Sequence, residues 1–356
     1  MIARPERWRA AIVGAGFIAR HHLDCLRTLR GVDIVAVCDR SRAVADAMAE
    51  RYGIAQTFTN HQAMLETVAP NVVHVTTPPI SHASIALDAI DAGAHVVIEK
   101  PITVTHEEWL DVRDRAAASG RWVLEDQNLR FDPTFLRLLG LIDDGALGVV
   151  RHVDARFYQA IGDSSHPFGD RNCPHPNLRL PGGPIFDFLP HLASLAYAIV
   201  GDFNDARPTW TPASEGPLPY DRFAADLKCE KGTATLSFDA VSQPDGFWID
   251  VFGDRAQATV NFYDGRLVLR RAAGGGSSWL AAVRNGLAES MAIGSATVTS
   301  LWEKVAGGPA TYRGLWTLIE QFYAGLGACS QPPMSLDEID AVSRMVAGCV
   351  TGLTGQ

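Results

Sequence analysis

Residues 9–23, RAAIVGAGFIARHHL, decide the fold of the amino-terminal part of the chain. An apolar run is followed by a glycine turn and a helical pattern, which predicts a strand, a tight turn and a helix. Gly14, Gly16 and Ala19 form a G-x-G-x-x-A motif in this turn. Gly14 allows the tight turn, Gly16 lets the backbone approach a pyrophosphate, and Ala19 lets the helix pack on the strand. Because the free N–H groups at a helix start bind phosphates, the stretch predicts a dinucleotide site.

The end of the next strand indicates which nicotinamide cofactor the site prefers. Residues 32–39, VDIVAVCD, are rich in β-branched side chains and end on Asp39. A carboxylate at this position can accept hydrogen bonds from the ribose hydroxyls, which favours NAD. Arg40 follows directly and is suited to hold a 2′-phosphate, so NADP stays open as an alternative.

The same alternation of strands and helices continues to about residue 127. Buried-strand patterns recur at 71–77, 95–100 and 122–127, and helical patterns separate them. Strands that alternate with helices of this length indicate a parallel, doubly wound sheet with right-handed crossovers. We therefore expect residues 1–127 to form a Rossmann dinucleotide-binding domain of the α/β class.

The pattern changes from about residue 149, where strands follow one another directly. Short turns such as KG and DG separate several of them, which indicates antiparallel pairing. We expect residues 128–356 to form an α+β domain for substrate binding and oligomerisation, built on a large, mostly antiparallel open sheet. Residues 271–310 are predicted to be an insertion with two short helices after a Gly-Ser turn. An open sheet with exposed apolar residues needs a cover, so we expect a homodimer or homotetramer.

Composition excludes several classes of protein. The chain has 356 residues with a net charge of −9, and it has no basic run at either end, which argues against a nucleic-acid partner. Its six cysteines are widely spread without a CxxC pair, as expected for free thiols in a reducing compartment. The opening residues lack the apolar segment of a signal peptide, and the apolar stretch at 185–200 is expected to be too short to span a bilayer. These features predict a soluble cytoplasmic protein without a membrane partner.

Residues 76–101, TTPPISHASIALDAIDAGAHVVIEKP, resemble the glucose–fructose oxidoreductase / inositol dehydrogenase / MocA family of nicotinamide-dependent enzymes. That family shares a Thr-Pro turn, a His on the following helix, and Glu-Lys-Pro after the next strand. Its second signature, a Gly-Gly pair followed by D-x-x-x-H, falls on Gly182-Gly183, Asp187 and His191. The resemblance extends to about residue 265. The family often has a Trp shortly before the Gly-Gly pair, where this chain reads CPHPNLRLPGG.

Three residues are the expected catalytic set for oxidising a secondary alcohol. Lys100 lies at the carboxyl end of a predicted strand, where a lysine can stabilise a developing alkoxide. His191 titrates near neutrality and is suited to relay the hydroxyl proton. Asp187, four residues earlier, is suited to bind a neighbouring substrate hydroxyl or to orient the imidazole. Each residue also has a purely structural alternative: Lys100 as a solvated strand end, Asp187 as a helix N-cap, and His191 as a core histidine. Pro190 is tolerated only in the first turn of a helix, which places Asp187 at or near the start of that helix.

The resemblance implies an NAD(P)-dependent oxidoreductase that acts on a sugar, an inositol or a related polyol. Two alternatives remain open: a redox-neutral enzyme with tightly bound NAD, and a catalytically silent nucleotide-binding sensor. A metal site at His166, Cys173 and His175 fits no standard zinc spacing, so no metal is expected. His82 and His95 are read as packing or capping residues, although the resemblance also places His82 beside the cofactor. The expected cofactor-binding residues are Gly14, Gly16, Phe17, Ile18, Asp39, Arg40, Thr76, Thr77, Pro78, His82, Glu99, Lys100 and Asn128. The expected substrate-binding residues are Lys100, Arg130, His166, Arg179, Asp187 and His191.

Overall fold

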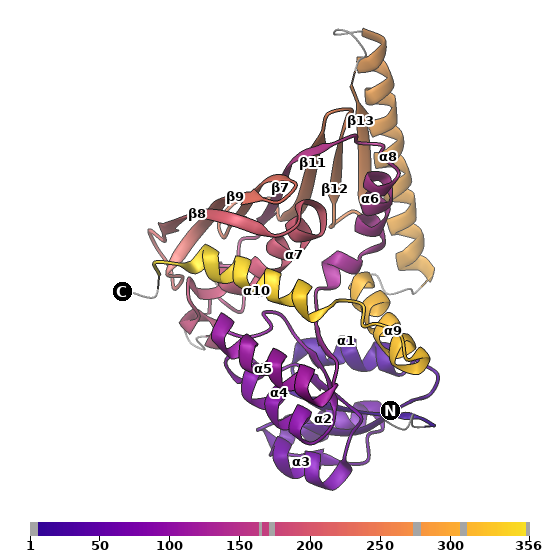
Figure 1. The fold of residues 1–356 in the computed structure, drawn as a ribbon, viewed down its shortest axis with the longest axis vertical. Coiled ribbons are helices and arrows are strands. Elements are labelled where there is room, and N and C mark those ends of the chain that lie inside the picture. The colour runs from indigo at the N-terminus through magenta and orange to yellow at the C-terminus, as the bar shows by residue number, and fades with distance from the viewer. Residues whose placement is uncertain (1–5, 164–165, 171–174, 273–278, 307–311, 354–356) are drawn as a thin grey trace. The chain divides into compact units, whose positions relative to one another are not determined.

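The computed structural model describes residues 6–163, 166–170, 175–272, 279–306 and 312–353 (Figure 1). The chain divides into two compact units. The first unit contains Met1–Gln127 and Leu315–Ser343, and the second contains Asn128–Gly314 and Arg344–Gln356.

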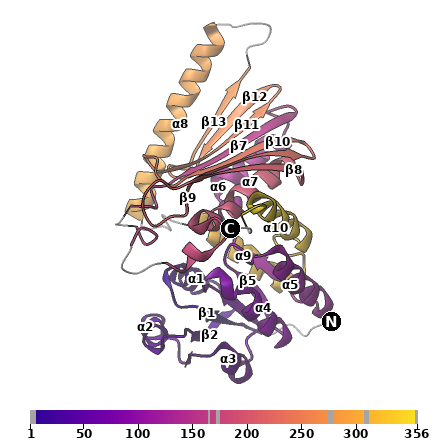
Figure 2. The ribbon, with the colours of Figure 1, turned by 90° about the vertical axis from the view of Figure 1, so that its left-hand side faces the viewer.

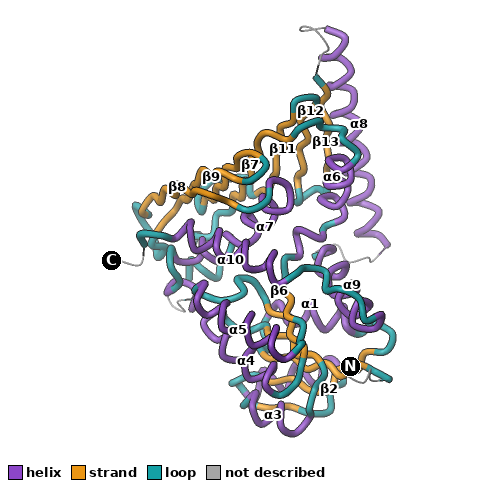
Figure 3. The backbone as a smooth tube through the Cα atoms, viewed as in Figure 1, coloured by secondary structure: helices purple, strands orange, loops and turns teal. Residues whose placement is uncertain are grey.

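The first unit is built on a six-stranded parallel sheet in the order β3-β2-β1-β4-β5-β6. Figure 3 shows strands of this sheet, such as β2 and β6, in orange among the purple helices. This confirms the predicted doubly wound sheet. The strand order reverses between β1 and β4, where Val13 pairs with Val75. In sheets of this kind, ligands bind at the point of reversal, beyond the carboxyl ends of the strands. The strands are β1 (Trp8–Val13), β2 (Val32–Cys38), β3 (Thr57–Phe58), β4 (Val72–Val75), β5 (His95–Ile98) and β6 (Val123–Glu125). The connecting helices are α1 (Phe17–Leu26), α2 (Arg42–Tyr52), α3 (His61–Val68), α4 (His82–Asp91) and α5 (His106–Ser119), with a 3₁₀ turn η1 (Pro79–Ser81) before α4.

A carboxyl-terminal segment completes the first unit. It consists of most of α9 (Arg313–Ala328) and the first half of α10 (Leu336–Val350). Trp122 packs edge-on against Phe322 of α9, and the Trp109 indole donates to Asp340 of α10 at 3.2 Å. The sequence-based division did not assign Leu315–Ser343 to this unit.

The second unit contains the predicted large, mostly antiparallel sheet (Figure 2). Its order is β13-β12-β11-β7-β10-β9-β8, and only the β7–β10 pair is parallel among the described strands. Alternate residues of β7 are buried beneath α7, and α6 packs on β12 and β13, so the two helices cover one face. The strands are β7 (Val150–Tyr158), β8 (Phe203–Pro212), β9 (Tyr220–Cys229), β10 (Gly232–Asp239), β11 (Gly246–Gly253), β12 (Ala256–Asn261) and β13 (Arg266–Arg271). The helical elements are α6 (Pro133–Asp143), α7 (Leu189–Val200) and the 3₁₀ turns η2 (Asn128–Phe131), η3 (Pro176–Arg179) and η4 (Gly183–Asp187).

The expected insertion forms one long helix, α8 (Trp279–Ala306), instead of two short ones. Its polar side chains bind the edge strand β13: Arg270 pairs with Glu289 at 2.7 Å, and Asn285 donates to the Arg271 carbonyl at 3.0 Å. These contacts support the helix along β13 and let it continue through its internal glycines (Figure 2). The predicted Gly-Ser turn falls mostly on residues 273–278, which lie outside the described residues.

The segment Gly183–Val200 is, by length and composition, the one candidate membrane span among the described residues, with a mean hydropathy of 1.3. This corrects the expectation that the stretch is too short. However, 78% of the segment is buried inside the protein, as in a core helix.

Candidate active site

The glycine-rich turn after β1 has the geometry of a phosphate-binding turn. Gly14 has φ +97°, and a Cβ there would lie 2.6 Å from the Thr76 carbonyl oxygen, so only glycine fits. Gly16 is the N-cap of α1 without a side-chain cap, and a Cβ on it would meet nothing within 4 Å. The helix start therefore presents its N–H groups to open space, as the binding of a pyrophosphate requires.

Asp39 connects the end of β2 to this turn. One carboxylate oxygen accepts from the Ala15 N–H at 2.9 Å, and the other accepts from the Ser41 N–H at 2.8 Å. The carboxylate is therefore fixed next to the glycine-rich turn and only half-buried, within reach of a ribose. Arg40 is exposed. Two large apolar side chains of this unit, Phe17 and Ile80, are 66% and 76% exposed, as expected where an aromatic or ribosyl group covers them.

His82 joins the turns that follow β4 and β5. Its Nε2 lies 2.8 Å from the Thr77 carbonyl oxygen and its Nδ1 lies 2.8 Å from the Pro101 carbonyl oxygen. Carbonyl oxygens only accept, so both bonds form together when both ring nitrogens carry a proton. The ring is fully buried, and its two contacts link the turn next to Pro78 with the turn next to Lys100. His95 packs between Trp8 and Trp122, in agreement with the packing role predicted for it.

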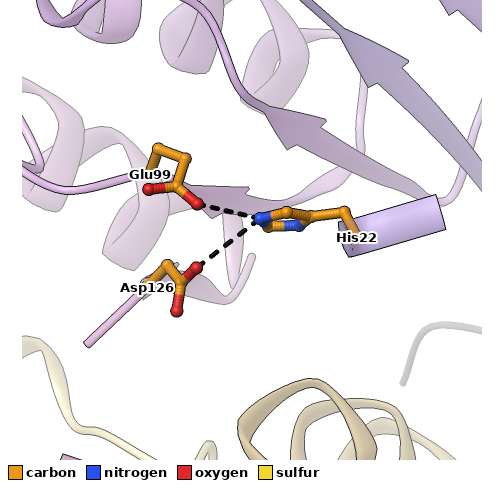
Figure 4. A group of neighbouring side chains, drawn as sticks. All are labelled: His22, Glu99 and Asp126. Atoms are coloured by element: carbon orange, nitrogen blue, oxygen red, sulfur yellow. Dashed lines mark hydrogen bonds and ion pairs between the residues drawn. The ribbon is translucent and has the colours of Figure 1, made fainter. Parts of the chain in front are cut away.

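A buried group of ionisable side chains lies behind the carboxyl edge of the sheet (Figure 4). His22 Nε2 is 2.9 Å from Glu99 Oε1 and 3.5 Å from Asp126 Oδ2. All three side chains are buried, and their ligand atoms lie within 4.8 Å of one another, so this group could also hold a metal ion. His22 comes from α1, Glu99 follows β5, and Asp126 follows β6.

Burial and neighbouring charges shift the pKa values of His22 and Glu99 in this group and of the nearby Glu125. Burial disfavours a charged His22, but hydrogen bonds to Asp126 and Glu99 outweigh it and raise the pKa of His22 to about 9. Burial, together with the charge of Asp126, raises the pKa of Glu99 to about 7, against the opposing effect of His22. Burial likewise raises the pKa of Glu125 to about 7, although its bonds to Gln127 and Ile102 and the positive charge of Lys100 lower it. Lys100 is therefore close to the buried carboxyl groups of Glu99 and Glu125 and interacts with the charge of Glu125.

Asp187 and His191 lie around the start of α7 in the second unit. Asp187 ends the 3₁₀ turn η4, Phe188 is the N-cap of α7, and His191 is in the first helical turn. Asp187 is thus near the helix start, as predicted, but it is not the N-cap, because η4 extends through it. Pro190 lies at the start of α7, where a proline is tolerated. His191 is 7% exposed.

The loop before η4 carries two histidines, one of which, His175, lies near Asp187. Burial lowers the pKa of His175, while the charge of Asp187 opposes the shift, which places these two groups close together. Phe168 contacts both His166 and His175 through its ring, at 5.1 Å and 4.5 Å between centroids. Cys173, the third residue of the metal alternative, lies outside the described residues.

The expected site residues divide between the two units. Lys100 belongs to the first unit, whereas Asp187 and His191 belong to the second. In the second unit, Arg130 stacks over the Tyr197 ring of α7 at 5.8 Å, Asn128 is buried and Arg179 is exposed. The first unit contains Gly14, Gly16, Phe17, Ile18, Asp39, Arg40, Thr76, Thr77, Pro78, His82, Glu99 and Lys100; the second contains Asn128, Arg130, His166, Arg179, Asp187 and His191.

The sequence reasoning missed His22, Glu125 and Asp126. The available signal was a polar residue inside an apolar pattern: His22 lies on the buried side of α1, and two acids end the strand pattern of β6. A buried ionisable group is costly unless it is partnered, so such positions call for a partner elsewhere in the chain.

Comparison with known proteins places both units in one family of enzymes. Residues 8–127 match the model described as "Oxidoreductase family, NAD-binding Rossmann fold", and residues 135–259 match the GFO/IDH/MocA C-terminal domain. D-glucoside 3-dehydrogenase of Escherichia coli is 33% identical over 195 residues, 54% of each chain. Inositol 2-dehydrogenase of Salmonella paratyphi B is 32% identical over 155 residues, 43% of this chain and 46% of the relative. The matched part thus spans about half the length of these two relatives.

One solved structure shows how far the likeness of fold extends. It is the WlbA dehydrogenase from Bordetella pertussis in complex with NADH and UDP-GlcNAcA. The match has a TM-score of 0.79 at 16% identity and covers 98% of this chain and 95% of that one. At this identity the likeness concerns the fold alone.

Proposed function

Because the chain belongs to the GFO/IDH/MocA family of NAD-binding oxidoreductases, we propose that it transfers a hydride between NAD and a secondary alcohol or ketone. The substrate class is a sugar, an inositol or a related polyol, as the names of two relatives suggest. The observation that carries the proposal is the open, uncapped glycine turn fixed to Asp39 at the switch point of a parallel sheet.

The residues of the first unit hold the cofactor and orient the reacting oxygen. The N–H groups at the start of α1 bind the pyrophosphate, and the Asp39 carboxylate accepts from the adenosine ribose. Bound NAD supplies the hydride acceptor. Lys100 donates a hydrogen bond to the substrate oxygen and stabilises the charge that develops on it. His82 keeps the Lys100 turn in place by holding the Pro101 carbonyl.

The residues of the second unit handle the substrate and its proton. His191, in the first turn of α7, accepts the hydroxyl proton during oxidation and returns it during reduction. Asp187 binds a neighbouring hydroxyl of the substrate, and His166 and His175 of the preceding loop contact its other polar groups. Arg130 and Arg179 belong to the same proposed substrate site. The chemistry requires no metal.

The open face of the second sheet is the proposed surface for a homodimer or homotetramer. It carries Tyr158 and Trp248, whose rings contact at 5.7 Å, and Phe252, which is 38% exposed. Exposed aromatic side chains of this kind are stabilised when a second copy covers them. Light scattering at micromolar concentration tests this, and the 38.4 kDa mass of one chain would contradict it. We also propose that the protein works in the cytoplasm.

A substrate screen tests the proposed function. Purified protein is incubated with NAD and a panel of sugars, inositols and polyols, and the nicotinamide absorbance band of NADH is followed. At least one substrate should give NADH in proportion to the ketone formed. Substrate conversion without net NADH would indicate a redox-neutral reaction instead. Tight NAD binding without any conversion would indicate a nucleotide sensor.

A further inference from the structure

A continuous row of hydrogen bonds runs through the first unit from Glu99 to Tyr323. Glu99 Oε1 is 2.9 Å from His22 Nε2, His22 Nδ1 is 2.9 Å from His74 Nδ1, and His74 Nε2 is 2.9 Å from the Tyr323 hydroxyl. Both histidines are fully buried, and the two end residues are 7% and 6% exposed. We call these four residues the His22 relay.

The relay connects opposite edges of the parallel sheet. Glu99 follows the carboxyl end of β5, on the side of the glycine-rich turn. Tyr323 lines a surface groove of about 470 Å³ together with Trp8 and Val32, which begin β1 and β2. The amino ends of parallel strands share one edge, so the groove opens on the side of the sheet away from the cofactor turn.

The hydrogen bonds of the relay can be arranged in two opposite directions. In one, Tyr323 donates to His74 Nε2, His74 donates from Nδ1 to His22, and His22 donates from Nε2 to the Glu99 carboxylate. In the other, the His22–Glu99 pair holds one more proton: charged His22 donates from Nε2 to the Glu99 carboxylate and from Nδ1 to His74, and His74 donates from Nε2 to the Tyr323 oxygen. Conversion of the second arrangement to the first moves the His22 Nδ1 proton to His74 and the His74 Nε2 proton to Tyr323. The His22–Glu99 pair loses one proton and the Tyr323 hydroxyl releases one proton to water, so the number of protons is conserved.

We propose that the His22 relay exchanges protons between the His22–Glu99 pair and water in the groove beside Tyr323. In this way the pair, whose Glu99 directly precedes Lys100, changes its net charge while cofactor and substrate cover the carboxyl edge. Proton exchange during turnover rests on the proposed function, whereas the hydrogen bonds of the relay are present in the protein without ligands.

The electrostatics of the surrounding groups are compatible with this movement. Asp126 and Glu99 raise the pKa of His22 to about 9 against burial, so the extra proton resides on His22. Burial, followed by the charge of His22, lowers the pKa of His74 well below its usual value, so His74 stays neutral and carries one proton, on either Nδ1 or Nε2. The other titratable groups that influence the relay and the acids beside it are His21, Cys25, Lys100, Glu125 and Glu320.

The first test uses the whole protein without ligands. Two-bond ¹H–¹⁵N NMR spectra of histidine-labelled protein show which nitrogen of each ring carries a proton. When His22 is charged, its Nδ1–H requires His74 to carry its proton on Nε2. As the pH rises through the titration of His22, the His74 proton should move to Nδ1. A His74 tautomer that stays constant while His22 titrates overturns the proposal.

The second test removes the outer end of the relay. Tyr323→Phe keeps the ring that stacks on His74 but loses the hydroxyl, so exchange of the His22 ring protons with water should slow by about tenfold. Tyr52→Phe is the matched control, because it also removes a hydroxyl bonded within the first unit, to Asp24, but outside the relay. Its exchange rate should equal that of the wild type. Equal rates in Tyr323→Phe and wild type overturn the proposal.

A third measurement separates the relay from the proposed function. During oxidation of a substrate in weak buffer, proton release reported by an indicator dye should lag behind NADH formation in Tyr323→Phe and coincide with it in the wild type. If the wild type forms no NADH, the proposed function fails while the NMR result stands. If Zn²⁺ shifts the His22 signals and fixes its tautomer at micromolar concentration, the cluster is a metal site and the relay is refuted.

Discussion

The two parts of the proposed site hold their ionisable groups in different ways. At the carboxyl edge of the first sheet, His22, Glu99 and Asp126 are buried and bonded to one another behind the turn that carries Lys100. In the second unit, His166 and His175 are half-buried on the loop before η4, where each contacts the Phe168 ring and accepts a hydrogen bond from a backbone N–H of the same loop. Buried, mutually bonded groups keep one geometry and have strongly shifted pKa values, whereas side chains on a loop adjust to what they contact.

This difference suggests a division between reaction and recognition. The groups proposed for proton and hydride transfer lie on or directly after regular elements: His191 in the first turn of α7 and Lys100 two residues after β5. Groups on the loop before η4 are suited to select among hydroxylated substrates. The predictions below test this division in order of decreasing effect.

The largest effect is expected from His191→Asn. The asparagine keeps a polar side chain in the first turn of α7 but cannot carry a proton at neutral pH. The value of kcat should fall by about 10²–10⁴-fold, and the acidic limb of the pH–rate profile should disappear. Near-normal turnover with an unchanged pH–rate profile would show that His191 is a core histidine. The proposed division between reaction and recognition would then not hold in the second unit.

The buried cluster should make stability depend on pH. The pKa of His22 is raised to about 9 in the folded protein, so its contribution is complete below the ordinary value of 6.5 and is lost as the pH rises through about 9. His22→Gln removes this contribution, on the order of 1–3 kcal/mol.

Urea unfolding of both proteins between pH 6 and pH 9.5 measures this dependence. The difference in free energy of unfolding between wild type and His22→Gln should shrink across the upper part of that range. A difference that stays constant would show that His22 is not charged in the folded protein. Tyr52→Phe again serves as a control outside the cluster.

A smaller effect is expected from the loop. His175→Ala removes a half-buried ring that contacts Phe168 and lies near Asp187. KM should rise by up to about tenfold with little change in kcat, and the ratio of kcat/KM values between two substrates should change. A loss of kcat as large as that of His191→Asn would show that the loop takes part in the reaction itself.

The smallest effect concerns the cofactor. Asp39 repels a 2′-phosphate, while Arg40 is exposed and free to swing toward it. NAD should therefore bind more tightly than NADP in titration calorimetry. If NADP bound tenfold more tightly, a difference of about 1.4 kcal/mol, Arg40 would determine the preference.

The sequence predicted what depends on short-range patterns. The glycine turn that begins at Gly14 and the acid Asp39 lie in one strand–helix–strand segment. Their spacing alone indicated a Rossmann unit and the edge of its sheet that binds the cofactor. The His22 group could not be predicted, because its members come from three distant segments and each looks like an isolated polar residue. The bond between His74 and Tyr323 joins residues 249 positions apart.

The same physical reason explains the other differences between sequence and structure. Two short helices were predicted for the insertion, yet bonds from Asn285 and Glu289 to β13 support the one continuous helix α8. The return of Leu315–Ser343 to the first unit depends on packing such as Trp122 on Phe322, which a local pattern does not reveal.

The most direct test of the account is Lys100→Ala, because Lys100 is the residue through which the buried edge is proposed to act on the substrate. Steady-state kinetics with the best substrate and calorimetry with NAD are measured on the same preparations of both proteins. The account predicts a fall in kcat of about 10²–10³-fold, as for removal of a donor that stabilises the transition state, with nearly unchanged affinity for NAD. A kcat close to that of the wild type would contradict it.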